Sequence, residues 1–373
     1  MKQHFTRFIA AIAAAVLCLT ALAGCASGAG RGDNQTAAVL EGEKYSLDEA
    51  KLYIYDSQYL VEESSEFMIS YMFASYEDFW NNDQDGKSYY QMNYAEGMNK
   101  LLQTKRLLKK AASDGITLDA DDQAKVDAAF ADFKETEANV VAAAGCSDEL
   151  LKQYLTENAL AVKTYLAMVE DVDTSFDEAE FRRKSVEALS VSAKTSKPTT
   201  DDSEEAEEYT EEEQTAAREA ATAEVLEKLK AGETLDEIAA DYNGDETVTV
   251  YSLGSLNLTP EDAVEEGAEY TSYRQFGWTL STGDVDYVEV TSGSNPTNYV
   301  MHCLNDDDPE LRKQAEDSEL VTRKLDLFSE RYAELTEKYN KYHVYEDVVN
   351  KVKQVVPMYE SEILGAQAGE AAE

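Results

Sequence analysis

Histidine and cysteine are rare in this sequence, and the common signatures of catalytic sites are missing. The 373 residues include three histidines, at 4, 302 and 343, and four cysteines, at 18, 25, 146 and 303. The chain has no CxxC pair, no zinc-ligand spacing and no GxSxG, HExxH, Walker or dinucleotide-binding motif. These absences exclude the enzyme classes that depend on such motifs, and we expect no metal and no cofactor.

Basic residues are also few. Lys and Arg number 33 against 75 Asp and Glu, which gives a formal net charge of −42. A surface this acidic favours solubility and repels nucleic acid and anionic lipid, so we expect no nucleic acid among the partners. Hydrophobic residues make up 43% of the chain, enough for the cores of one large or two ordinary domains.

The N-terminus has the layout of an export signal. Lys2 and Arg7 accompany an apolar run, 8–23, that is short for a membrane span. The run leads into "LAGC" at 22–25, which resembles the bacterial lipobox, whose cysteine is lipidated and becomes the new N-terminus. We therefore predict a lipid on Cys25, which anchors the protein outside the cytoplasm, on the outer face of a bacterial cytoplasmic membrane. An ordinary secretory signal is the alternative.

Hydrophobic periodicity divides the rest into helical regions around one α+β unit. Residues 185–193 alternate like a strand, an acidic stretch follows over 197–213, and a box at Thr234–Glu237 begins a short helix. Thr259-Pro260 is expected to begin a further helix. The predicted segments are a signal peptide 1–24, a flexible tether 25–44, a helical N-terminal domain 45–183, an α+β domain 184–305, a C-terminal helical segment 306–356 packing on the N-terminal domain, and a tail 357–373.

This arrangement resembles the parvulin-type foldase lipoproteins, which are PrsA-like and more distantly SurA-like. The motifs that carry the resemblance are "LKAGETLDEIAADYN" at 229–243, "FGWTLSTGDVDYVEV" at 276–290 and "NYVMHCL" at 298–304. The resemblance implies an α+β fold in which a mainly helical, chaperone-like domain carries an inserted parvulin-like (FKBP-like) domain. It also implies unfolded or nascent exported proteins as clients, leaves room for a homodimer, and suggests peptidyl-prolyl cis-trans isomerase activity.

The active-site residues of that family are largely replaced here. Ser190 and Val300 stand where the resemblance places two histidines, and His302 follows two residues after the second position. Asp245 lies near the place of the family's Asp or Cys. Because the other two histidines lie outside the module, a histidine pair is impossible there. Isomerisation of a proline peptide bond forms no new covalent bond, but a catalyst must lower a barrier of about 18–20 kcal/mol. Without the histidine pair we expect weak or absent activity.

An aromatic series on the first helices has two interpretations. Tyr71, Phe73, Tyr76 and Trp80, together with nearby methionines, would suit adaptable apolar contact with unfolded clients. The same stripe would also suit a helical core.

A polar stretch behind these aromatics nearly fits a calcium loop. Asn81, Asp83, Asp85 and Gly86 match its first, third, fifth and sixth positions, but Met92 replaces the bidentate Glu. A polar turn between helices is therefore the expected structure. Whether Cys146 and Cys303 are joined stays open.

The leading functional hypothesis is a membrane-anchored extracytoplasmic foldase or chaperone. A non-catalytic envelope assembly or interaction lipoprotein is the first alternative. A solute-binding lipoprotein is the second, but the chain begins with a helix and has only one α+β unit.

Overall fold

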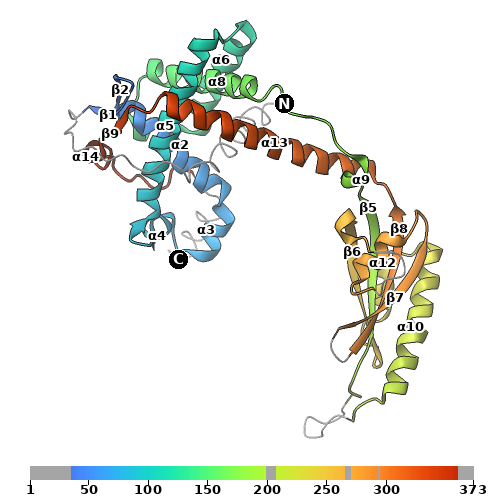
Figure 1. Cartoon of the computed structure of the whole chain (residues 1–373). Helices are drawn as coiled ribbons and strands as arrows, with labels where there is room; N and C mark the ends of the chain where they lie inside the picture. Colours follow the sequence, from blue (N-terminus) through green and yellow to red (C-terminus); the bar gives the residue numbers. More distant parts are fainter. Residues whose placement is uncertain (1–34, 199–206, 265–269, 293–294, 360–373) are drawn as a thin grey trace. The chain divides into compact units, whose positions relative to one another are not determined.

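The computed structural model describes residues 35–198, 207–264, 270–292 and 295–359. The predicted signal peptide, Cys25 and most of the predicted C-terminal tail lie outside these residues. The chain divides into two compact units, Met1–Val172 with Arg323–Glu373, and Asp173–Thr322 (Figure 1). We call them the N/C unit and the middle unit. Helices and sheets occur in both, in agreement with the α+β prediction. No helix within the described ranges has the length and apolar character needed to cross a membrane.

Helices dominate the N/C unit. They are α2 (Leu47–Ser64), α3 (Glu66–Met72), α4 (Tyr76–Asn81), α5 (Tyr89–Asp114), α6 (Ala120–Thr136), α7 (Ala138–Ala144), α8 (Asp148–Met168), the end of α13 (Pro309–Lys338) and α14 (Glu346–Val349). Side-chain caps fix where five of them begin, because each cap accepts a hydrogen bond from the backbone N–H three residues later; the caps are Ser46, Ser75, Ser88, Asp119 and Ser147.

A small antiparallel sheet corrects the predicted tether. Strands β1 (Thr36–Leu40) and β2 (Glu43–Ser46) form a hairpin, and β9 (Tyr342–Val344) pairs with the other side of β1. Leu40 is fully buried, and the hairpin turn places Gly42 at a φ of +86°, which glycine adopts without strain. Residues 36–44 are therefore a structured hairpin that places Ala37, Ala38 and Leu40 in the core, and not a flexible linker.

The C-terminal part of the chain completes this unit. On α13, Phe328 and Leu335 are buried against Leu107 of α5 and Tyr165 of α8. Further along, Val349, Val352 and Met358 belong to the same core as the helices α2, α4 and α5.

The middle unit is a four-stranded antiparallel sheet between helices. Its strands β5 (Lys184–Ala193), β6 (Val248–Leu258), β7 (Val285–Ser292) and β8 (Asn295–Asn305) lie in the order β6-β5-β8-β7. Helices α10 (Glu211–Ala231) and α11 (Leu235–Asp241) cover one face, and α12 (Tyr273–Thr279) covers the other. A short α9 (Glu178–Phe181) precedes the sheet. The helix predicted after Thr259 is only a 3-10 turn, Pro260–Asp262.

The stretch "FGWTLSTGDVDYVEV" supplies α12, a turn and β7. Gly277 of α12 lies directly on the sheet: a Cβ at this position would meet the Met301 Cε at 2.7 Å and the Leu258 Cδ1 at 2.9 Å. The glycine therefore allows α12 to approach the sheet closely.

Candidate functional site

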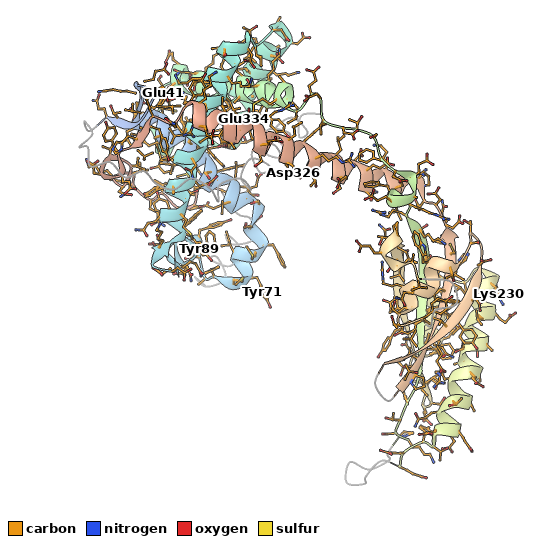
Figure 2. The ribbon with its side chains drawn as sticks, in the orientation of Figure 1. Glu41, Tyr71, Tyr89, Lys230, Asp326 and Glu334 are labelled. Atoms are coloured by element: carbon orange, nitrogen blue, oxygen red, sulfur yellow. The ribbon has the colours of Figure 1, made fainter. Side chains whose placement is uncertain are left out.

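Helix α3 exposes nearly all of its apolar side chains. Phe67, Met68, Tyr71 and Met72 are 76%, 51%, 84% and 63% exposed, and only Ile69 is buried. Figure 2 labels Tyr71 on this helix. The Phe67 and Tyr71 rings lie parallel, with centroids 6.5 Å apart. Soluble proteins seldom expose several large apolar side chains on one short element without a use for them. We call these four residues the α3 patch.

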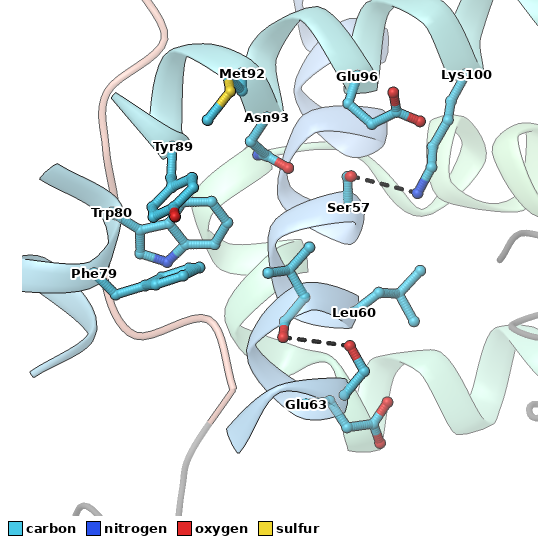
Figure 3. Close-up of a pocket in the computed structure, with 12 residues that line it drawn as sticks. Ser57, Leu60, Glu63, Phe79, Trp80, Tyr89, Met92, Asn93, Glu96 and Lys100 are labelled. Atoms are coloured by element: carbon cyan, nitrogen blue, oxygen red, sulfur yellow. Dashed lines mark hydrogen bonds between the residues drawn. The ribbon is translucent and has the colours of Figure 1, made fainter. Parts of the chain in front are cut away.

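An apolar pocket is formed by the neighbouring helices α2, α4 and α5. It has a volume of about 520 Å³ and is lined by Ser57, Leu60, Val61, Glu63, Ser64, Phe79, Trp80, Tyr89, Met92, Asn93, Glu96 and Lys100 (Figure 3). Its aromatic wall is formed by Phe79, Trp80 and Tyr89. The ring centroid of Phe79 is 4.9 Å from that of Trp80 and 4.9 Å from that of Tyr89.

Three polar residues of this pocket, Ser57, Glu96 and Lys100, interact with one another. The Lys100 ammonium donates to the Ser57 hydroxyl at 3.3 Å. Burial raises the pKa of Glu96 above its ordinary value, and the positive charge of Lys100 opposes this shift. The pocket thus offers aromatic and aliphatic surface with few fixed polar partners, into which an apolar group can fit.

The four predicted client-binding residues differ in how far their side chains are exposed. Tyr71 is exposed, and Phe73 is half-buried with its ring edge-on to Phe79 at 5.4 Å. Tyr76 and Trp80 are only 5% and 1% exposed, as the core interpretation of the stripe expects, although Trp80 also lines the pocket. Trp80 can be buried because its indole N–H has a buried acceptor, the Glu62 carboxylate, at 2.7 Å.

Phe67 is the residue that the sequence reasoning left out of the site. The available signal was spacing, since Phe67 with Tyr71 and Met68 with Met72 are i, i+4 pairs that share one side of a helix.

The predicted isomerase residues do not form one site. Ser190 pairs across the strands with Tyr299, whereas Val300 pairs with Leu189. Since neighbours along a strand point to opposite faces, Ser190 faces the α12 side and Val300 the α10 side. Val300 is fully buried in the α10 core. Ser190 and Val300 therefore do not face one another across a shared pocket.

His302 and Asp245 are also far from each other along the sheet. His302 lies opposite Glu187, with its Nδ1 3.7 Å from a Glu187 carboxylate oxygen. Asp245 lies beyond the other end of the β5–β6 ladder, where it accepts backbone hydrogen bonds from Thr247 and Val248. These hydrogen bonds hold the pKa of Asp245 below its ordinary value. Asp245 is thus a turn cap.

The calcium-like stretch forms a tight hairpin, β3 (Asp83–Gln84) and β4 (Lys87–Ser88), in which the Asp83 carboxylate accepts from the Gly86 N–H at 2.8 Å. It is the polar turn that the sequence indicated. Within the described ranges, no group of three or more His, Cys, Asp or Glu side chains is placed to hold a metal. Cys146 and Cys303 are both free thiols.

No protein-family model matches the chain, and no curated protein matches it significantly. The foldase protein PrsA from Lactococcus lactis is a similar solved structure, with 13% identity and a TM-score of 0.28 over 86% of this chain and 100% of that one. Others are PrsA from Streptococcus pneumoniae (13%, TM-score 0.23, 77% and 97%) and from Bacillus subtilis (14%, TM-score 0.20, 87% and 96%). At these values the likeness assigns neither a family nor an activity to this chain.

Proposed function

We propose that this protein is an extracytoplasmic foldase or chaperone that holds unfolded exported polypeptides on the N/C unit. The observation that carries the proposal is the α3 patch, with four large apolar side chains exposed beside an apolar pocket. Full burial of one such side chain is worth about 1.5–3 kcal/mol, so four of them give useful affinity for any apolar segment without a fixed sequence. Two of the four are methionines, whose flexible side chains adapt to varied surfaces.

The charge of the chain fits this role. A protein with an exposed apolar patch risks self-association, and a net charge of −42 opposes it through repulsion between copies. We propose further that Cys25 carries a lipid that keeps this surface next to the membrane where exported chains emerge.

Isomerase activity in the middle unit is proposed to be weak or absent. The residues at the positions of the family's histidines, Ser190 and Val300, face opposite sides of the sheet. The measurement is turnover of a proline tetrapeptide by the mature protein. Turnover at the rate of an active parvulin, abolished by His302→Ala, would show that the unit catalyses without a histidine pair.

Suppression of client aggregation tests the main proposal. A variant with Gln at positions 67, 68, 71 and 72 keeps good helix formers on α3 but removes its apolar surface. It should lose most of its ability to keep a denatured client soluble. The matched control replaces four exposed apolar residues elsewhere with Gln, namely Leu166, Tyr251, Tyr287 and Val321.

The control variant should protect the client like the wild type. Equal protection by both variants would reject the α3 patch as the client surface. Absence of protection by the wild type would favour a non-catalytic assembly lipoprotein instead.

A further inference from the structure

The segment that follows α14 lies in a cradle of side chains from α2, α5 and α7. Residues 353–359 are neither helix nor strand, yet side chains of these helices hydrogen-bond to the main chain at four of the seven residues, Lys353, Val355, Met358 and Tyr359. The donors to its carbonyls are the Tyr94 hydroxyl to Val352, the Tyr55 and Tyr90 hydroxyls to Lys353 (2.8 Å each), the Gln58 amide to Val355 (2.7 Å) and the Asn139 amide to Met358 (3.2 Å). We call these donors, together with Glu62, the cradle.

Glu62 binds the far end of the segment. Its carboxylate accepts from the backbone N–H groups of Met358 at 2.7 Å and Tyr359 at 2.9 Å. Its other oxygen accepts from the Gln58 amide at 2.8 Å and the Trp80 indole at 2.7 Å. Because Trp80 also lines the apolar pocket, it connects the pocket to the cradle through Glu62.

All of these contacts to the segment go to main-chain atoms, which every polypeptide carries. The side chains of the segment add two apolar anchors, since Val352 is 5% and Met358 1% exposed, whereas Lys353 and Val355 face solvent. The cradle therefore recognises a polypeptide main chain with apolar residues near its two ends, whereas the side chains at the exposed positions between them, 353, 355 and 357, are not read.

Gln58 and Glu62 are fully buried when the segment is in place. Buried polar groups are costly without partners, so an empty cradle would need another polypeptide or water to replace the lost hydrogen bonds. A second polypeptide replaces them best, because it offers the same carbonyl and N–H groups at the same spacing.

We propose that the cradle is a second polypeptide-binding site, and that residues 352–359 are its resident occupant, exchanged for a segment of a client that is neither helix nor strand. This rests on the proposed chaperone function. The occupant is defined by its chemistry: an unfolded segment with an apolar side chain at each end and no charge at the position of Met358.

The test uses the full chain with a loosened segment. Val352→Lys with Met358→Lys removes both anchors and leaves the cradle unchanged. A fluorescent peptide with the sequence "VKQVVPMY" of residues 352–359 should bind this variant at least about tenfold more tightly than the wild type, whose own segment competes at high effective concentration. A peptide of different sequence with the same two anchors should also bind, whereas one N-methylated at the last two residues should not.

Two additional results separate this inference from the proposed function. Adding Tyr55→Phe and Tyr90→Phe to the loosened variant should weaken peptide binding severalfold, while Gln substitution of the α3 patch should not change it. No peptide binding to the loosened variant, with aggregation suppression through the α3 patch intact, would overturn the cradle alone.

Hydrogen exchange tests on the wild-type protein whether the segment leaves the cradle, so the result does not depend on the folding of a variant. The amides of Met358 and Tyr359 should exchange through a local opening, faster than the most protected amides of α5. Protection equal to that of α5 would show that the segment leaves only on global unfolding and would overturn the proposal.

Discussion

Replacing Phe328 tests whether the C-terminal helix is part of the N/C core. Phe328 is fully buried, with its ring 5.0 Å from that of Tyr165 on α8 and 5.5 Å from that of Tyr332. Phe328→Ala removes this contact and leaves a cavity, which typically costs about 3–5 kcal/mol. Since domains are stable by only about 5–15 kcal/mol, the N/C unit should lose a large share of its stability.

The two tryptophans of the chain allow each unit to be followed separately. Trp80 lies in the N/C unit and Trp278 in the middle unit. In urea, Phe328→Ala on a Trp278→Phe background should move the Trp80 transition to lower denaturant. The free energy of unfolding that this transition reports should fall by about 3–5 kcal/mol. On a Trp80→Phe background the Trp278 transition should not move.

The control is Val321→Ala, because Val321 is 54% exposed on the same helix. It should shift neither transition by more than about 0.5 kcal/mol. A loss below about 1 kcal/mol for Phe328→Ala would mean that α13 is not packed as described, and the reasoning would fail.

Three further predictions concern single residues. Burial and the neighbouring Asp56 raise the pKa of Glu137 well above its ordinary value of 4.5, so the folded state holds this proton more strongly than the unfolded state. Stability should therefore fall as pH rises from 4.5 through the raised pKa, and Glu137→Gln should flatten this fall in urea titrations; an unchanged pH profile would contradict the assignment. Gly97→Ala should destabilise the N/C unit by about 1–3 kcal/mol, because the new Cβ would lie 2.8 Å from the Ile54 Cα; equal or higher stability in urea would show that α2 and α5 are not so close. Cys25→Ala should leave the protein unprocessed or release it from membranes in a fractionation assay, and normal processing with full membrane retention would reject the lipobox.

Local signals in the sequence predicted much of the middle unit. The box at Thr234 and Glu237 is present as a reciprocal cap of α11, and the alternation at 185–193 became β5. Such features depend on neighbouring residues, so a sequence shows them directly. The same reasoning failed at 36–44, because β1 pairs not only with its neighbour β2 but also with β9, some 300 residues away along the chain.

The candidate sites were harder to predict for the same reason. Trp80 looks like any other aromatic residue of the stripe until α2 supplies Glu62 as the acceptor for its buried indole. The cradle had no signal at all, because the hydroxyls of Tyr55 and Tyr90 find their acceptor at Lys353, far along the chain. Ser190 and Val300 were placed by resemblance, and only the register of β5 with β8 shows that they face opposite sides.

Site-specific crosslinking tests the central claim most directly. A photoreactive phenylalanine analogue at position 71, which is 84% exposed on α3, should crosslink to a denatured client in the full chain. The matched control is the same analogue at Tyr251, which is 64% exposed in the middle unit and should crosslink weakly. Strong crosslinking at 71 and little at 251 is the predicted result; equal crosslinking at both positions, or none at 71, would contradict the proposal that α3 holds unfolded polypeptide.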